Sequence, residues 1–181
     1  MGQTGSMLDD AARRFIEAQR IFFVASAPLD GAGPVNLSAK GLDTFRILGP
    51  TTVVSIDFEG SGVETMAYLK ENERIVRMFC AFQGPPNIFR RYGHGRVVEP
   101  HQEKFAVRGQ EFPAHQKARS VIVVELTPLT DSCGYGVPIF NYDGEREQLT
   151  RWAGNQGPEG LKVYRERKNG CGLDGFPGIS V

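Results

Sequence analysis

Residues Val54 to Leu69 read VSIDFEGSGVETMAYL and join an alternating apolar run to a helix start through a glycine-rich turn. β-Branched side chains are frequent from Thr52 to Phe58, which predicts a strand, and Gly60-Ser61-Gly62 ends it. Ser61 stands three positions before Glu64, the spacing of a capping box, so we expect a helix to begin near Gly62. The free N–H groups of a first helical turn attract phosphate, and glycines let a ligand approach the backbone. An ordinary strand–turn–helix connection uses the same residues, so this stretch alone leaves both interpretations open.

The composition suits one globular domain with a core of its own, because 40% of the 181 residues are apolar. Lys plus Arg and Asp plus Glu both number 21, so no net charge draws the chain to nucleic acid or to an anionic membrane. No apolar run approaches the length of a transmembrane helix, and the opening residues MGQTGSMLDD lack the basic start and apolar centre of a signal peptide. We therefore expect a cytoplasmic protein without nucleic-acid or membrane partners.

Short apolar runs separated by turn residues predict the other strands. They cover residues 21–27, 33–38, 45–48, 51–58, 74–82, 88–98 and 119–126, and residues 130–135 continue into a last one. Helices are expected from Ser6 and Asp9 onward, after Gly62, and over residues 101–108, 145–152 and 160–168. Gly93 and Gly95 lie inside one predicted strand, which indicates a bend or a bulge. Many short strands with few helices between them predict a mainly β fold, an antiparallel barrel that is closed or nearly closed.

Four segments in this order carry a family resemblance. They are residues 21–27 (IFFVASA), 34–41 (PVNLSAKG), 57–82 (DFEGSGVETMAYLKENERIVRMFCAF) and 84–98 (GPPNIFRRYGHGRVV). Together they resemble the pyridoxamine 5′-phosphate oxidase-like FMN-binding split barrels, and the likeness extends over roughly residues 12–142. It implies a six- or seven-stranded antiparallel split β-barrel with peripheral helices. It also implies a homodimer with FMN in the cleft between the two barrels, its phosphate held by basic and hydroxyl side chains.

The resemblance also indicates which residues of this chain contact the cofactor. Those on the second predicted strand would lie beside the flavin, and those at the strand–helix junction would lie close to it. The residues carried over are Asn36, Ser38, Lys40, Asp57, Ser61, Gly62 and Thr65. The junction residues agree with the independent prediction of a helix N-terminus that attracts phosphate.

The C-terminal part departs from the family pattern. Oxidases that act on pyridoxamine phosphate end in a segment rich in Arg and aromatic residues, whereas this chain ends LKVYRERKNGCGLDGFPGISV. We therefore expect a split-barrel domain of residues 1–142, with residues 143–181 forming a helical extension packed on it. The predicted function is FMN-dependent oxidation or reduction of a small organic substrate, with no catalytic residue assigned. The alternative is a carrier on the same barrel that binds flavin, deazaflavin or heme without turnover.

Other chemistry-bearing residues favour structural roles. His94, His101 and His115 lack metal-ligand spacing, so no metal site is predicted. The three cysteines, Cys80, Cys133 and Cys171, are odd in number and widely spaced, which predicts reduced thiols that are buried or semi-buried. Arg90 and Arg91 are adjacent on a predicted strand, so at most one can face a site, and a solvated pair is expected. Trp152 is expected to pack against neighbouring apolar residues rather than against a flavin.

Overall fold

The computed structural model describes residues 7–113, 117–127 and 130–180. Its helices are α1 (Asp10–Glu17), α2 (Glu64–Asn72), α3 (Glu103–Gly109) and α4 (Gln148–Lys168). Its strands are β1 (Phe22–Ser26), β2 (Asn36–Lys40), β3 (Phe45–Ile47), β4 (Thr52–Phe58), β5 (Arg74–Cys80), β6 (Ile88–Val98), β7 (Ala118–Leu126) and β8 (Thr130–Ser132). The described part of the chain thus confirms a mainly β fold with flanking helices. It has eight strands, where the family resemblance implied six or seven, and the short β3 and β8, which fall on segments expected to be strands, form ladders of their own.

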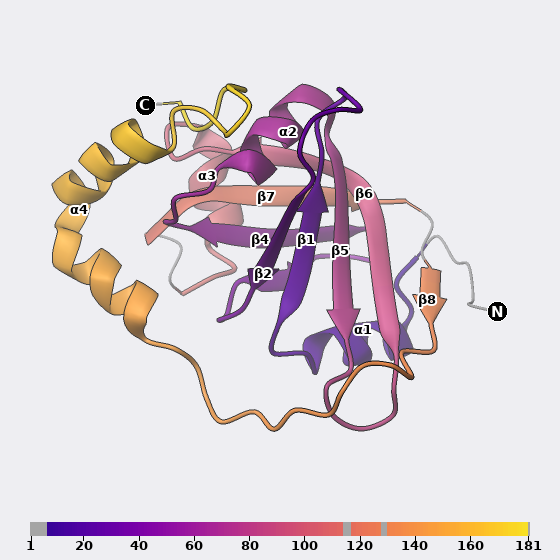
Figure 1. Cartoon of the computed structure of the whole chain (residues 1–181). Coiled ribbons are helices and arrows are strands. Elements are labelled where there is room, and N and C mark those ends of the chain that lie inside the picture. Colours follow the sequence, from indigo (N-terminus) through magenta and orange to yellow (C-terminus); the bar gives the residue numbers. More distant parts are fainter. Residues whose placement is uncertain (1–6, 114–116, 128–129, 181) are drawn as a thin grey trace.

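All of these strands pair antiparallel, in the order β2-β1-β5-β6-β7-β4-β3, with β8 paired to β6. In Figure 1, β1, β2, β5 and β6 run nearly upright while β4 and β7 cross behind them, so the sheet folds over on itself. The strands at the two ends of this order, β2 and β3, do not pair with each other, so the barrel is split. An ion pair between Lys40 of β2 and Asp57 of β4 bridges the opening.

The barrel interior is a packed apolar core. Rings of Phe22, Phe45 and Phe79 lie 5.2 to 5.5 Å apart between centroids. Leu8 and Ile16 close the end beside α1, and Leu69 of α2 joins the same cluster. Asp9, expected within the first turn of this helix, is instead its N-cap and accepts a hydrogen bond from the Ala12 N–H at 2.8 Å, while Ser6 lies outside the described residues.

The glycines of β6 provide space for neighbouring groups. A Cβ atom at Gly93 would lie 2.5 Å from the Glu125 carbonyl oxygen, and one at Gly95 would lie 2.8 Å from a methyl of Leu69. The irregularity of the ladder lies elsewhere, between Asp57 and Phe58 of β4 where it pairs with β7. Of the predicted bend or bulge, the bulge is therefore wrong, because the ladders of β6 keep their register at these glycines, which serve close packing.

Helix α2 begins at Glu64, two residues later than expected. Its N-cap is Val63, which makes no side-chain capping hydrogen bond, and Ser61 is exposed to solvent. The predicted capping box of Ser61 and Glu64 is therefore wrong. As a result, the N-cap side chain accepts no hydrogen bond from the first N–H groups of α2.

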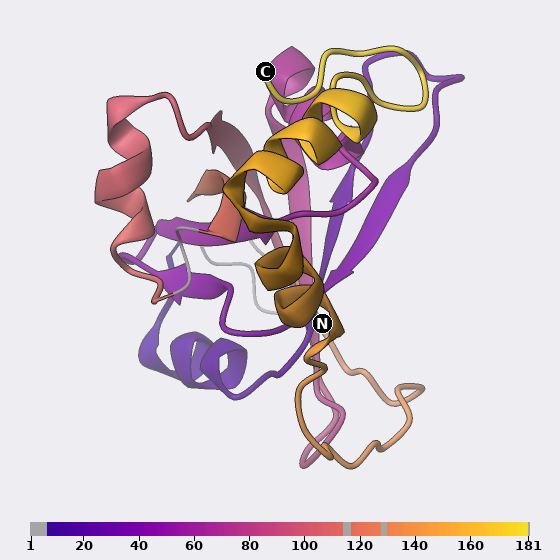
Figure 2. The same ribbon diagram turned by 90° about the vertical axis from the view of Figure 1, so that its left-hand side faces the viewer.

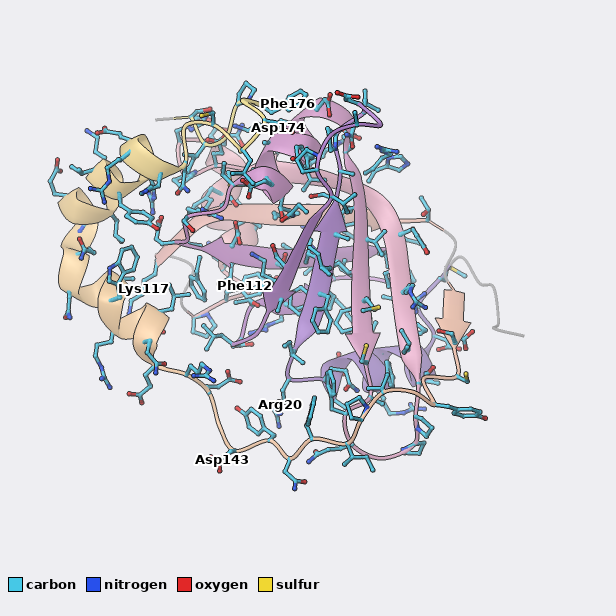
Figure 3. The ribbon with its side chains drawn as sticks, viewed as in Figure 1. Arg20, Phe112, Lys117, Asp143, Asp174 and Phe176 are labelled. Carbon is cyan, nitrogen blue, oxygen red and sulfur yellow. The ribbon has the colours of Figure 1, made fainter. Side chains whose placement is uncertain are left out.

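The C-terminal part runs along one side of the barrel and then back over α2. Helix α4 is interrupted at Gly157, where φ is 63° and ψ is 176°, so the two predicted helical stretches are the arms of one kinked element. Figure 2 shows the two arms in front of the sheet. Trp152 and Tyr164 pack edge to face across the kink at 4.9 Å, a structural contact as expected. Beyond α4, Phe176 packs on Tyr68 of α2, and Figure 3 shows it beside Asp174 in the closing loop.

Two further expectations need correction. Cys133 and Cys171 are exposed, and only Cys80 is buried as predicted. Arg91 is not part of a solvated pair, because only 1% of it is exposed, while its neighbour Arg90 is half-buried and donates to Ser132.

Within the described ranges, which omit His115, no group of histidine, cysteine and acidic residues is placed to hold a metal ion. No helix in those ranges is long and apolar enough to cross a membrane.

Candidate functional site

The predicted cofactor residues gather where β2, the end of β4 and the start of α2 meet. Alternate residues of β2 share one face, so Asn36, Ser38 and Lys40 point the same way. The Asn36 amide donates to the Thr65 hydroxyl of α2 at 2.8 Å and to the Ser26 hydroxyl at 3.1 Å. The Ser38 hydroxyl donates in turn to the side-chain oxygen Oδ1 of Asn36 at 3.3 Å. These contacts form one polar network across β1, β2 and α2.

Asp57 is the centre of a buried charge cluster. Lys40 Nζ lies 2.7 Å from its Oδ1, and the Arg119 guanidinium lies 2.9 Å from its Oδ2. Only 3% of Asp57 and 4% of Arg119 are exposed. Burial by itself would raise the pKa of Asp57, but the charges and hydrogen bonds of Lys40 and Arg119 outweigh it and hold that pKa below its usual value. Asp57 is therefore ionised at neutral pH.

Arg119 also fixes the turn between β4 and α2. Its two terminal nitrogens donate to the carbonyl oxygens of Gly60 at 2.8 Å and Gly62 at 2.6 Å. The sequence prediction missed this residue, which looked like the first position of an ordinary strand. The β4–β7 ladder shifts register at this point, with Asp57 opposite Ser120 and Phe58 opposite Ala118, so that Arg119 has no direct partner in β4.

Cations outnumber carboxylates within the Asp57 cluster, and the Glu64 carboxylate of the first turn of α2 lies beside Gly62. Two cations, Lys40 and Arg119, face one carboxylate at Asp57. Lys40 keeps 26% of its side chain exposed, so its ammonium group can donate to another acceptor besides Asp57. Ser61 and Gly62 are exposed in the turn, and a Cβ atom at Gly60 would meet nothing within 4 Å. This combination of ammonium, hydroxyl and free N–H groups suits an anion such as phosphate.

The C-terminal part supports the same turn from behind. Asn169 is completely buried and donates to the Gly60 carbonyl oxygen at 2.9 Å. Arg165 of α4 donates through Nε to the buried Glu59 carboxylate at 2.7 Å. Neither residue was predicted, since each lies more than a hundred positions from its partner in the sequence.

An open, largely apolar pocket of about 460 Å³ lies next to the polar network. It is formed by β1, β5 and β6 and includes Ser26, which accepts from Asn36, and Val35, which precedes β2. Tyr92 and His94 of β6 line its other side. The pocket therefore lies beside the hydrogen-bonded network that connects Ser26 and Asn36 to Thr65 in the first turn of α2.

Comparison with known proteins identifies relatives of the chain. No protein-family model matches the sequence. The "pyridoxamine 5′-phosphate oxidase family protein ustO" of Aspergillus flavus is 33% identical, with the match covering 95% of this chain and 76% of that protein. Among solved structures, HupZ from Group A Streptococcus has a TM-score of 0.56 at 14% identity, covering 74% of this chain and 100% of that one. An FMN-binding protein from Syntrophomonas wolfei has a TM-score of 0.50 at 17% identity, covering 66% and 82% of the two chains. At these identities the solved structures show a shared fold.

Proposed function

The chain belongs to the pyridoxamine 5′-phosphate oxidase family, and from this premise we propose that it binds FMN and oxidises or reduces a small organic molecule. The observation that carries the proposal is the uncapped start of α2 beside the Lys40–Asp57–Arg119 cluster. FMN differs from riboflavin by a phosphate, which is an anion. At this site a helix N-terminus, two cationic side chains and exposed turn residues lie together, and each of these features suits a phosphate.

The proposal gives each predicted residue a role. Ser61, Gly62 and Thr65 hold the phosphate with their N–H and hydroxyl groups, and Lys40 donates to it. Asp57 positions Lys40, because both of its oxygens already accept from cations inside the protein. The network of Asn36 and Ser38 lines the path from the phosphate to the flavin ring. Bound FMN would supply the hydride or electron transfer, so the protein need only bind, orient and shield the ring.

The first test is the absorbance spectrum of the protein as purified. Flavin bands are expected, followed by turnover of a reduced nicotinamide with an added acceptor. A flavin spectrum without turnover would favour the carrier alternative, and a Soret band would favour heme, for which His94 in the apolar pocket would be the residue to replace. A spectrum with neither, and no binding of added FMN, would contradict the proposal.

Lys40→Ala is expected to weaken FMN binding about tenfold or more and to leave riboflavin binding nearly unchanged. A charge-assisted hydrogen bond contributes roughly 1.5 to 3 kcal/mol, and riboflavin lacks the phosphate that receives it. Fluorescence titration with both ligands measures the difference. Lys104→Ala is the matched control, because Lys104 is exposed on α3. Equal affinity of wild type and Lys40→Ala for FMN would exclude Lys40 as a phosphate contact.

We also propose a homodimer with the cofactor between the protomers. Large apolar side chains are exposed on β2, where 66% of Leu37 is accessible, and in the segment of residues 133–147, where Tyr135, Ile139 and Phe140 are exposed. Exposed apolar groups of this size are typical of interfaces. Light scattering at micromolar concentration is expected to give twice the mass of one chain, and a monomer that still holds FMN would contradict this arrangement. We also propose a cytoplasmic location without membrane or nucleic-acid partners, because the sequence has balanced charge and no long apolar run.

A further inference from the structure

Two arginines lie side by side inside the barrel, away from the proposed flavin site. Arg77 of β5 and Arg91 of β6 are each only 1% exposed. They are direct partners in the β5–β6 ladder, so their side chains emerge on the same face with Cβ atoms about 4.5 to 5.5 Å apart. That face is the core, because Phe79 and Phe89, two positions along each strand, are buried in it.

Most of the N–H groups of these two guanidinium groups have no acceptor. Arg77 donates through Nη2 to the Ser55 hydroxyl at 2.8 Å and to the Ile122 carbonyl oxygen at 3.5 Å, but its Nε and Nη1 have no hydrogen-bond partner in the described chain. None of the three nitrogens of Arg91 has one. Both groups lie over aromatic rings, Arg77 at 5.3 Å from Phe45 and Arg91 at 3.6 Å from Phe89. A ring face attracts the positive charge but does not replace hydrogen-bond acceptors in the plane of the guanidinium.

Both arginines are nevertheless cationic. Burial lowers the pKa of Arg77 to about 9, and burial also lowers the pKa of Arg91 to about 9 although Asp9 and Asp131 act against it. Asp131 makes no hydrogen bond to Arg91 in the described chain, because all three nitrogens of Arg91 and one oxygen of Asp131 are buried without a partner. It is the direct β8 partner of Phe89, so its side chain emerges on the same face of the sheet as Arg91, at the edge of β6 away from β5. By contrast, the buried Arg119 forms an ion pair with Asp57.

We propose that the barrel interior binds one small inorganic anion, of the size of chloride, between Arg77 and Arg91. Two adjacent buried cations destabilise a fold unless a negative charge or several acceptors accompany them. An anion between the two strands accepts from the free nitrogens of both side chains at once. It has to be small, because the surrounding positions are filled by the side chains of the apolar core, such as Phe45, Phe79 and Phe89. This site is independent of flavin binding.

The test compares thermal unfolding of the full chain in sodium chloride with that in sodium gluconate of equal ionic strength, since gluconate is too large to enter. The midpoint is expected to rise saturably with chloride, by about 5 to 10 °C at a hundredfold excess over the dissociation constant. Arg77→Met and Arg91→Met should each raise the chloride concentration that gives half of this stabilisation by about tenfold or more. The double variant should show no stabilisation by chloride. The double variant should also fold, because replacement of buried charges by apolar groups of similar volume is tolerated.

Two control variants locate the effect. Lys40→Ala, at the proposed phosphate site, and Arg96→Met, whose side chain is 78% exposed on β6, should keep the full chloride response. Loss of the response in Lys40→Ala would move the anion to the flavin site and overturn the proposal. Identical curves in chloride and gluconate would overturn it as well.

Crystals grown in sodium bromide provide a direct measurement. An anomalous bromine peak is expected within hydrogen-bonding distance of both Arg77 and Arg91. Anomalous peaks confined to the surface would contradict the proposal, whatever the thermal data show.

Discussion

Replacement of Arg119 by methionine is expected to lower the free energy of unfolding by about 3 to 5 kcal/mol and to abolish FMN binding at micromolar concentration. The substitution leaves the buried carboxylate of Asp57 with Lys40 as its remaining cation, and Lys40 is partly exposed. It also removes the donors to the carbonyl oxygens of Gly60 and Gly62. The turn that is proposed to hold the phosphate would therefore lose its support while one unbalanced charge stays buried.

Urea unfolding measures the first effect, and its pH dependence identifies the cause. The pKa of Asp57 is lowered in the folded protein, so the stabilisation from its ion pairs is fully present above its unfolded pKa of about 3.9. It disappears as the pH falls through the lower folded value. The difference between wild type and Arg119→Met should accordingly be largest near pH 7 and shrink below about pH 4. Arg108→Met on α3 is the control, because Arg108 is exposed. A difference that is small at pH 7, or independent of pH, would contradict this role of Arg119.

The strands could be predicted from sequence because each depends on a local pattern. Alternation and β-branched residues indicated β4, and the apolar run after Arg119 indicated β7. The partner of Asp57 could not be found in this way, since Arg119 lies 62 positions away and reaches it only through the register of β4 with β7. The same limit applies to Arg91. The alternation of a strand shows that Arg90 and Arg91 face opposite sides, but only the position of β6 between β5 and β7 decides which one is buried.

The start of α2 shows a different limit. Ser61 and Glu64 have the spacing of a capping box, but Arg119 and Asn169 bind the carbonyl oxygens of the turn and hold it in another conformation. A tertiary contact has replaced a local one. The prediction of an N-terminus near Gly62 was close, while the prediction of its cap was wrong.

The division into a barrel of residues 1–142 and an extension of residues 143–181 stays a prediction, and the contacts of the last residues lead to a test of it. Ile179 is buried with Val63 and Met66, which belong to the N-cap and first turn of α2. The Ser180 N–H donates to Glu99 at 2.6 Å, and Lys70 of α2 pairs with the same carboxylate at 2.6 Å. The end of the chain is thus integrated with the helix that begins at the proposed phosphate site.

Truncation after Lys168 is therefore expected to remove FMN binding and to lower the free energy of unfolding by about 3 to 5 kcal/mol. The truncation removes Ile179, which packs on Val63 and Met66, and it deletes the Asn169 amide that binds Gly60. Circular dichroism and urea unfolding measure the stability, and flavin fluorescence measures the binding.

Asn169→Ala separates a positioning role from a general loss of structure, because it removes the hydrogen bond to Gly60 and keeps Ile179 in place. Asn169 is completely buried and holds the turn through the Gly60 carbonyl oxygen, so the variant should weaken FMN about tenfold while riboflavin, which lacks the phosphate, binds nearly as before. Asn155→Ala, an exposed position on α4, should leave both affinities unchanged. If Asn169→Ala weakens both ligands equally, the contact serves stability alone. If wild type binds riboflavin as tightly as FMN, the proposed phosphate site itself is wrong, and the two failures can be told apart in one titration series. A truncated protein that still binds FMN with wild-type affinity would instead make residues 169–181 an independent extension, and substrate selection would then be the role to test for them.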